Sequence, residues 1–263
     1  MDKDLLKQSE EKYRLLFERA PLGYQSLDIN GNILDVNKAW LDFFGFSKKE
    51  VLGKRFGEFL VPEQGDLFKS KFQHFKEVGE IYNVEFEVVR KNGLKAFTSY
   101  HGVIGYDKGG NFEQTHCIFQ DITERKTAQK QLKLLSSAVE QASEGIAIVD
   151  LEGNLIYLNS AFATNHGYAR EELKGKHLST FHTPEQMPAI EAANRQLQKS
   201  GEFHGEIWHK RKDGTIFPSL MHNSILLDDG GNKIGMIGTF IDITERKKAE
   251  DELRLHSEIM TNL

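Results

Sequence analysis

The side chains that could ligate a metal ion or perform catalysis in this chain of 263 residues are ten histidines, one cysteine and 39 acidic residues. The histidines form no His-Xaa-Xaa-Xaa-His pair, and Cys117 has no second cysteine to join it, so we predict no metal site. The sequence also has no phosphate-binding glycine loop and no Gly-Xaa-Ser-Xaa-Gly motif. We therefore predict no catalytic residues and a protein that is not an enzyme.

The overall composition restricts the partners and the compartment. The net charge is −5, and the 34 basic residues are interspersed with the acidic ones, which argues against a nucleic-acid surface. A single cysteine cannot form an intrachain disulfide, which is typical of a reducing compartment. No apolar run approaches the roughly 20 residues that span a bilayer, and the N-terminus lacks a signal-peptide pattern. These observations predict a cytoplasmic protein with no membrane segment in this chain.

The elements that must position any site occur twice. Residues 119–126 (FQDITERK) return as residues 240–247 (FIDITERK), and 242 − 121 gives a period of 121 residues. Each copy begins with apolar, strand-forming residues and continues with strong helix formers. Asp121 and Asp242 are suitable helix N-caps, and a Glu follows each of them three residues later, as in a capping box. We predict a last strand that leads directly into a capped helix, in each of two repeated domains.

Hydrophobic periodicity predicts the same order of elements in both halves. In the first half it predicts a helix over 3–20, two strands around an Asn-Gly turn at 30–31, short helices, and a helix over 66–78. Three antiparallel strands follow, over 82–88, 96–104 and 113–120. The strand at 82–88 alternates strictly, so Tyr82, Val84 and Phe86 are expected to face the core.

Taken together, the repeated motifs resemble those of PAS domains. The motifs are the Asp-Xaa-Xaa-Gly-Asn turn, Asn37 and Asn159 after the second strand, Glu-Xaa-Xaa-Gly-Lys, the Lys-Asn/Asp-Gly turn and the final Asp-Ile-Thr-Glu-Arg-Lys. The resemblance implies an α+β fold of two PAS domains, each a five-stranded antiparallel sheet with helices on one face and a small pocket. The expected boundaries are an N-terminal amphipathic helix at 1–20, PAS domains at 21–124 and 143–245, a linker helix at 125–142, and an exit helix at 246–263 where a further domain begins.

The same resemblance, with the alternation, suggests which residues line the two pockets. In the first domain the candidates are Tyr82, Val84, Phe86, Thr98, Tyr100, Cys117 and Phe119. In the second domain they are Phe203, Ile207, Ser219, Met221, Asn223 and Phe240. Gly205 and Gly238 leave more room in the second pocket, so an unidentified small molecule is expected there if either pocket is occupied. The alternative is a filled core with no ligand.

No cofactor is predicted for either domain. The resemblance to flavin-binding PAS photoreceptors implies a reactive cysteine in a Gly-Xaa-Asn-Cys motif, but residues 53–56 (GKRF) and 175–178 (GKHL) stand there instead. Haem-binding PAS domains carry an axial histidine on the long helix. Here His74 lies too near the end of that helix, and residues 184–200 contain no histidine.

The linker helix has the spacing of a coiled-coil seam, 4-3-4-3, in Ala128, Leu132, Leu135, Val139 and Ala142. The exit helix repeats this spacing in Ala249, Leu253, His256, Met260 and Leu263. We predict a parallel homodimer with Leu132, Leu135 and Val139 in its seam. The alternative is an amphipathic helix that packs on its own domain.

These features together predict a non-enzymatic sensory module of a larger signalling protein, such as a two-component system. A small ligand or partner would change the packing of a sheet, and the exit helices would pass the change to an output domain outside this chain, a histidine kinase or a cyclic-dinucleotide enzyme. The predicted hinge residues are Asp121, Thr123, Asp242 and Thr244. The alternative is a structural dimerisation scaffold with filled cores and no ligand.

Overall fold

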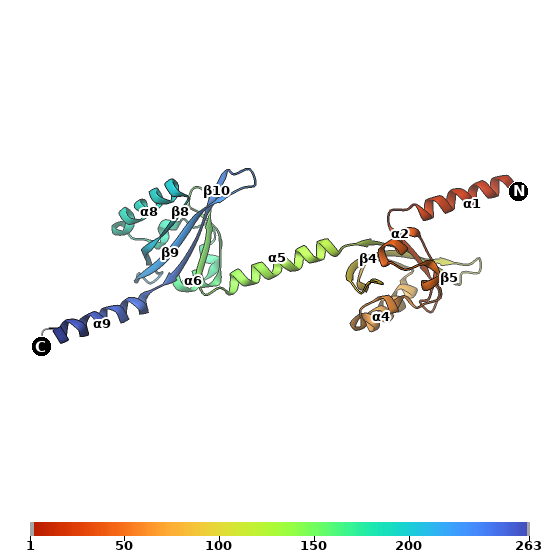
Figure 1. Cartoon of the computed structure of the whole chain (residues 1–263), viewed down its shortest axis with the longest axis horizontal. Coiled ribbons are helices and arrows are strands. Elements are labelled where there is room, and N and C mark those ends of the chain that lie inside the picture. Colours follow the sequence, from red (N-terminus) through yellow and green to blue (C-terminus); the bar gives the residue numbers. More distant parts are fainter. Residues whose placement is uncertain (1–2, 262–263) are drawn as a thin grey trace. The chain divides into compact units, whose positions relative to one another are not determined.

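The computed structural model describes residues 3–261, and these form two compact units with their boundary between Gln131 and Leu132 (Figure 1). Residues 1–2 and 262–263, at the outer ends of the two predicted terminal helices, lie outside the described residues.

The first unit contains a five-stranded antiparallel sheet, in the order β2-β1-β5-β4-β3, within the described part of the chain. The strands are β1 (Gly23–Leu27), β2 (Ile33–Val36), β3 (Glu80–Val89), β4 (Lys95–Tyr106) and β5 (Phe112–Asp121). The helices are α1 (Lys3–Glu18), α2 (Lys38–Phe44), α3 (Lys48–Val51), α4 (Gly65–Val78) and α5 (Thr123–Gln141), with 3-10 turns at Phe56–Phe59 and Pro62–Gln64.

The second unit repeats this arrangement with a sheet in the order β7-β6-β10-β9-β8. The strands are β6 (Gly145–Val149), β7 (Leu155–Leu158), β8 (Glu202–Lys210), β9 (Ile216–Leu227) and β10 (Lys233–Asp242). The helices are α6 (Ser160–His166), α7 (Arg170–Leu173), α8 (Met187–Ser200) and α9 (Thr244–Thr261), with 3-10 turns at Leu178–Phe181 and Pro184–Gln186. The predicted α+β fold of two five-stranded antiparallel sheets with helices is therefore confirmed.

A buried asparagine fixes the start of each fold. Asn37 Oδ1 accepts hydrogen bonds from the backbone N–H groups of Trp40 (3.0 Å) and Tyr24 (2.9 Å), and its Nδ2 donates to the carbonyl oxygen of Leu22 (2.9 Å). The side chain therefore caps α2 and ties it to the beginning of β1. Asn159 makes the equivalent bonds in the second unit.

The helices and one face of each sheet enclose the core. In the first unit this core is rich in aromatic rings, with Trp40 stacked on Phe44 at a centroid distance of 4.1 Å and Tyr100 in edge contact with Phe56 at 5.3 Å. The core of the second unit has fewer large rings, and Phe162, Phe181, Phe217 and Phe240 provide most of them.

The prediction that Tyr82 faces the core is wrong. The register between β3 and β4 shifts between Ile81 and Val84, because Asn83 has a left-handed backbone (φ 54°) and forms a β-bulge. The extra residue reverses the alternation at this point, so Ile81 and Val84 pack against the core. Tyr82 lies on the outer face with 63% of its surface exposed, where its hydroxyl donates to Glu80.

Candidate functional site

The second unit contains a cavity of about 330 Å³. Its walls are the inner face of the sheet, α6, α8 and the 3-10 turn at Leu178–Phe181. Small-molecule sites in proteins commonly have volumes of about 300–1,000 Å³ and mostly apolar walls. The cavity is therefore large enough for a small ligand.

Four of the residues predicted for the second pocket line this cavity: Ile207, Met221, Asn223 and Phe240. The other two are buried nearby but do not line it. Phe203 packs in a separate small cluster with α8, and its ring fills the space over Gly205. Ser219 Oγ donates a hydrogen bond to the carbonyl oxygen of Ile207 at 2.8 Å. Of the two glycines expected to create room, Gly238 does line the cavity.

The corresponding space in the first unit is only about 30 Å³. It is lined by four of the predicted residues: Val84, Phe86, Tyr100 and Cys117. Thr98 and Phe119 are buried but do not line it, and Thr98 Oγ1 donates to the carbonyl oxygen of Phe86 at 3.2 Å. Burial raises the pKa of the Cys117 thiol to about 12, so this cysteine is not a reactive thiolate.

The first core is filled by larger side chains than the second, and three positions on the paired strands illustrate the difference. In the first unit Gly102 pairs with Cys117 across β4 and β5, and Tyr100 lies two residues before Gly102. At the same places in the second unit, Asn223 pairs with Gly238 across β9 and β10. Met221 takes the place of Tyr100. The Tyr100 ring and the Cys117 thiol fill the first core, whereas a flexible Met and a Gly leave the second one open.

Asn223 contributes an unpaired polar atom to the larger cavity. Only 8% of its surface is exposed, and its Oδ1 has no hydrogen-bond partner among the residues that the structure describes. Gly238 makes room for this atom, since a Cβ there would lie 2.6 Å from Asn223 Oδ1. A buried acceptor without a donor is unfavourable, so such a group often marks a binding site.

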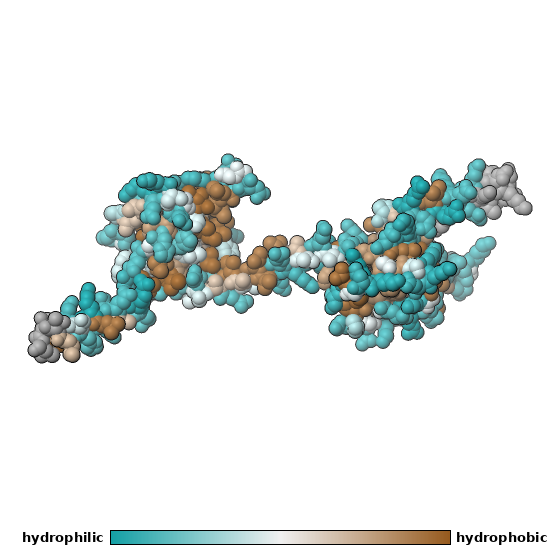
Figure 2. Space-filling model, viewed as in Figure 1, coloured by the Kyte–Doolittle hydropathy of each residue, from teal (hydrophilic) through white to brown (hydrophobic). Residues whose placement is uncertain are grey.

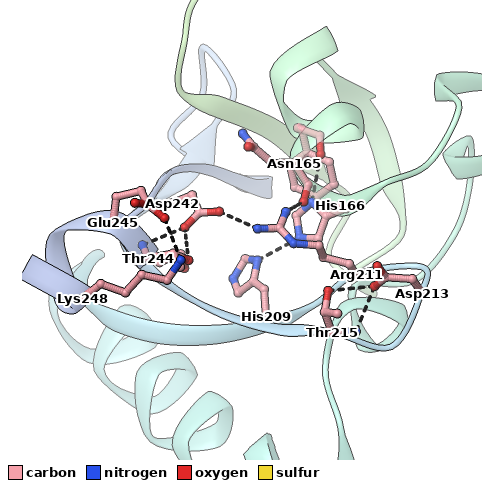
Figure 3. A network of polar contacts seen from close by, with 12 residues as sticks. Asn165, His166, His209, Arg211, Asp213, Thr215, Asp242, Thr244, Glu245 and Lys248 are labelled. Atoms are coloured by element: carbon pink, nitrogen blue, oxygen red, sulfur yellow. Dashed lines mark hydrogen bonds and ion pairs between the residues drawn. The ribbon is translucent and has the colours of Figure 1, made fainter.

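Two histidines that sequence reasoning missed are buried in the same domain. His166 Nε2 is 2.9 Å from His209 Nδ1 (Figure 3). His209 Nε2 is 3.2 Å from Met221 Sδ. Burial lowers the pKa of His166 to about 4 and that of His209 well below its usual range, so both imidazoles are neutral at pH 7. The signal was present in the sequence, because continuing the alternation from Ile207 along the strand places His209 on the inner face.

The predicted hinge residues meet at the start of each exit helix. Asp242 Oδ1 accepts hydrogen bonds from Thr244 N (2.8 Å) and Thr244 Oγ1 (2.5 Å), while Asp242 Oδ2 pairs with Arg211 Nη2 at 2.5 Å (Figure 3). Burial acts to raise the pKa of Asp242, but the bonds from Thr244 and Arg211 outweigh it and hold the pKa below its usual range. Asp121 makes the equivalent contacts, with Thr123 N at 2.9 Å and Arg90 Nη2 at 3.0 Å.

The contacts at the start of α9 differ from the capping box that the sequence predicts. The helix begins at Thr244, and the carboxylate of Asp242 binds the first helical N–H group rather than the third. Glu245 pairs with Lys248 at 2.9 Å instead of reaching back to Asp242. The junction is therefore an Asp turn locked by an arginine from the neighbouring hairpin.

Arg211, the partner of Asp242, also contacts the helix that carries His166. Arg211 Nη1 donates to the carbonyl oxygen of Asn165, and the guanidinium lies 3.9 Å from the centroid of the Phe217 ring. A series of contacts therefore runs from His209 at the cavity to His166, continues through the backbone of the adjacent Asn165 to Arg211, and ends at Asp242 before α9 (Figure 3).

A family model described as a PAS domain matches residues 21–124 and again residues 143–245. The chain belongs to the PAS-domain family. PAS domains are sensory rather than catalytic domains, and the relatives of this chain include sensor kinases and other signalling proteins.

Three curated relatives illustrate this setting. The sporulation kinase C of Bacillus subtilis is 33% identical over 118 residues, which are 44% of this chain and 27% of the kinase. The C4-dicarboxylate transport sensor protein DctS of Rhodobacter capsulatus is 30% identical over 45% of this chain and 19% of the sensor. The oxygen sensor protein DosP of Escherichia coli is 20% identical over 88% of this chain and 29% of its own length. The matched segments thus span less than a third of these relatives.

Among solved structures, a PAS domain from Colwellia psychrerythraea matches with 26% identity and a TM-score of 0.42, over 43% of this chain and 98% of that domain.

The predicted seam of the linker helix is open to solvent in this single chain. Leu132 and Leu135 are 68% and 55% exposed, and Val139 is half-buried. Figure 2 shows apolar side chains exposed along α5.

Between residues 3 and 261, no helix is long and apolar enough to cross a membrane. The same residues contain no group of three or more His, Cys, Asp or Glu side chains that could hold a metal ion.

Proposed function

We propose that this chain is the sensory part of a signal-transduction protein, in which the second PAS domain binds a small molecule in its 330 Å³ cavity. Binding changes the contacts of the cavity wall, and the change reaches α9 through the hinge at Asp242. An output domain beyond α9 responds to it. The chain itself carries out no chemical reaction.

The observation that carries this proposal is the difference between the two cavities. Equivalent positions of the same fold enclose about 330 Å³ in the second domain and about 30 Å³ in the first. The larger space reaches the surface beside the exposed Leu151 and has the size of a typical small-molecule site, whereas the smaller one is too small for a ligand. The unpaired Oδ1 of Asn223 points to the same conclusion.

The contacts between His209, His166, Arg211 and Asp242 offer the route by which occupancy alters the hinge. His209 lines the cavity, and Asp242 holds the first N–H group of α9. A ligand that moves the His209 ring also shifts the helix on which His166 lies, and with it the carbonyl group that Arg211 binds. Such a change needs only a small difference in free energy between two positions of α9.

For the first domain the observations favour the alternative, a structural role with a filled core. Its cavity of about 30 Å³ has room for about one water molecule, which would satisfy the buried hydroxyl of Tyr100. We propose that this domain holds α1 and α5 in place, and that these helices pair with those of a second copy through the seam at Leu132, Leu135 and Val139 to form a parallel homodimer.

The relatives support a proposal for the output domain. Two of them are named a kinase and a sensor protein, and another, from Escherichia coli, is a probable diguanylate cyclase. We propose a histidine kinase or a cyclic-dinucleotide enzyme as the output. The single buried Cys117, which forms no disulfide, suits the reducing cytoplasm as the site of action.

Native mass spectrometry of the full chain, purified gently from its expression host, tests the proposal. We expect a bound small molecule, lost in a triple variant that copies the first domain: Met221→Tyr, Asn223→Gly and Gly238→Cys. The matched control, Tyr100→Met in the first domain, should retain the extra mass. If the parent protein carries no extra mass and no small-molecule library produces any, the second domain has no ligand and the scaffold alternative holds for both domains.

A further inference from the structure

The hydrogen bonds of His166 determine which of its nitrogens carries the proton. His166 Nδ1 lies 2.9 Å from the carbonyl oxygen of Phe162, and a carbonyl oxygen can only accept, so Nδ1 is the protonated nitrogen. The ring is neutral, which leaves a lone pair on Nε2. The contact of 2.9 Å between this lone pair and His209 Nδ1 then requires that His209 is protonated on Nδ1.

The same reasoning leaves His209 Nε2 as a hydrogen-bond acceptor. Its nearest polar neighbour is the thioether sulfur of Met221, at 3.2 Å, and a thioether has no proton to donate. Within residues 3–261 no other contact is recorded for this nitrogen. His209 lines the cavity, so its lone pair is an acceptor that a ligand can reach.

Asn223 Oδ1 is a second acceptor on the same wall. Asn223 and Met221 lie two residues apart on β9 and therefore face the same side of the sheet. Like His209 Nε2, the oxygen finds no donor within the described part of the chain. The rest of the wall is mainly apolar, with Ile207, Phe240 and Leu197 among its residues. The cationic group of Lys233, which also lines the cavity, already donates to Gln198 Oε1 at 2.8 Å.

We infer that the ligand is a neutral, largely apolar molecule that carries hydroxyl or N–H groups, and that these groups donate hydrogen bonds to His209 Nε2 and Asn223 Oδ1. This inference rests on the proposed function, since it assumes that the cavity binds a ligand. A carboxylate or phosphate brings only acceptors and would leave these two acceptors unpaired. An ether or ketone would leave both of them unpaired. The first domain has Val88 and Gly102 at the equivalent positions and offers neither acceptor.

Three probes with the same ring system test this ligand class: 2-naphthol, which has one donor; 2-methoxynaphthalene, which has none; and 2-naphthoate, which is an anion. The readout is NMR of the full chain with ¹³C-labelled methionine methyl groups. Met187, Met221 and Met236 line the cavity, whereas Met260 is 76% exposed on α9 and serves as the reference. Affinities come from the concentration dependence of the cavity signals.

We expect 2-naphthol to shift the cavity signals and to bind about tenfold more tightly than 2-methoxynaphthalene, with 2-naphthoate weakest. In at least one of the variants Asn223→Leu and His209→Val, 2-naphthol and 2-methoxynaphthalene should bind about equally tightly. Circular dichroism checks that each variant is folded. If the ether or the anion binds as well as 2-naphthol, or if the preference survives both variants, the ligand class is wrong although the cavity still binds. If none of the probes shifts the cavity signals, both the inference and the proposed binding function fail.

Discussion

The backbone N–H of Phe97 donates a hydrogen bond to Thr123 Oγ1 at 2.9 Å, and its carbonyl oxygen accepts one from Ile122 N at 2.8 Å. These two bonds fasten the start of α5 to β4 in the first domain. In the second domain Pro218 takes the place of Phe97. Its carbonyl oxygen still accepts from Ile243 N at 3.0 Å, but a proline has no N–H to donate. The start of α9 is therefore held to β9 by one hydrogen bond fewer than the start of α5 is to β4.

We expect the start of α9 to open more easily than the start of α5. One missing hydrogen bond corresponds to about 0.5–1.5 kcal/mol, which allows up to about tenfold faster amide exchange. Hydrogen exchange should be faster at residues 243–251 than at 122–130, and Pro218→Phe should slow it by restoring the donor. Phe97→Pro is the matched variant and should accelerate exchange at 122–130. Unchanged rates in both variants would show that this bond does not hold the junctions.

Replacing Asp242 with Ala should loosen α9 without unfolding the domain. The carboxylate binds Thr244 N and Arg211, and losing such a cap costs about 0.5–2 kcal/mol, which is small beside the stability of the core. Asp121→Ala should have a smaller effect on α5, because Asp121 is more exposed and its ion pair with Arg90 is longer, 3.0 Å against 2.5 Å.

Hydrogen exchange and urea unfolding measure the two effects of Asp242→Ala separately. Exchange should accelerate at residues 243–251 while the sheet stays protected. Asp213→Ala is the charge-matched control, because Asp213 caps the nearby turn at Thr215 and does not contact α9. Global unfolding of Asp242→Ala, or exchange like that of the parent at 243–251, would rule out a hinge role for Asp242.

The sequence was sufficient for the fold because the motifs that define it are local. The Asn-Gly turns, the capping asparagines Asn37 and Asn159 and the repeated Asp-Ile-Thr-Glu-Arg-Lys segments each specify short-range geometry, and their order gives the topology. Strict alternation also placed Val84 and Phe86 on the inner face. It failed at Tyr82, because the bulge at Asn83 depends on a left-handed backbone that the sequence does not signal strongly.

The site was harder to predict, because the volume of a cavity depends on how the neighbouring side chains fill the space between the elements. The sequence showed small residues at Gly205 and Gly238, but only the three-dimensional structure shows that the Phe203 ring fills the space over Gly205 whereas Gly238 faces the cavity. The contact between His166 and His209 joins residues 43 positions apart, and no spacing rule for metal ligands identifies such a pair.

Leu132→Glu should convert the proposed dimer into a monomer. Leu132 is 68% exposed in the single chain, so the substitution removes little buried surface within the chain and adds a charge to the predicted seam. Lys133→Glu, on the same helix but outside the predicted seam, is the control and should leave the dimer intact. Light scattering gives the mass of each protein. A monomeric parent at high micromolar concentration would exclude the dimer seam.

The buried histidines should make the second domain sensitive to acid. The folded-state pKa of His166 is lowered to about 4, and that of His209 is also lowered, so the folded domain stays unprotonated where the unfolded chain takes up protons. The contribution of these neutral imidazoles to the free energy of unfolding is therefore fully present above about pH 6.5. It is lost as the pH falls towards 4, by up to about 3 kcal/mol for His166. Other groups also titrate in this range, so the useful quantity is a difference between variants.

Combining His166→Phe with His209→Val copies the first domain, where Phe44 and Val88 occupy these places, and should flatten the loss of stability between pH 6.5 and 4. In a Trp40→Phe background, the remaining tryptophan, Trp208, reports unfolding of the second domain alone in urea titrations at each pH. The exposed His204→Val is the control and should keep the slope of the parent. An equally steep fall in the double variant would mean that the two imidazoles are not the groups whose protonation unfolds this domain.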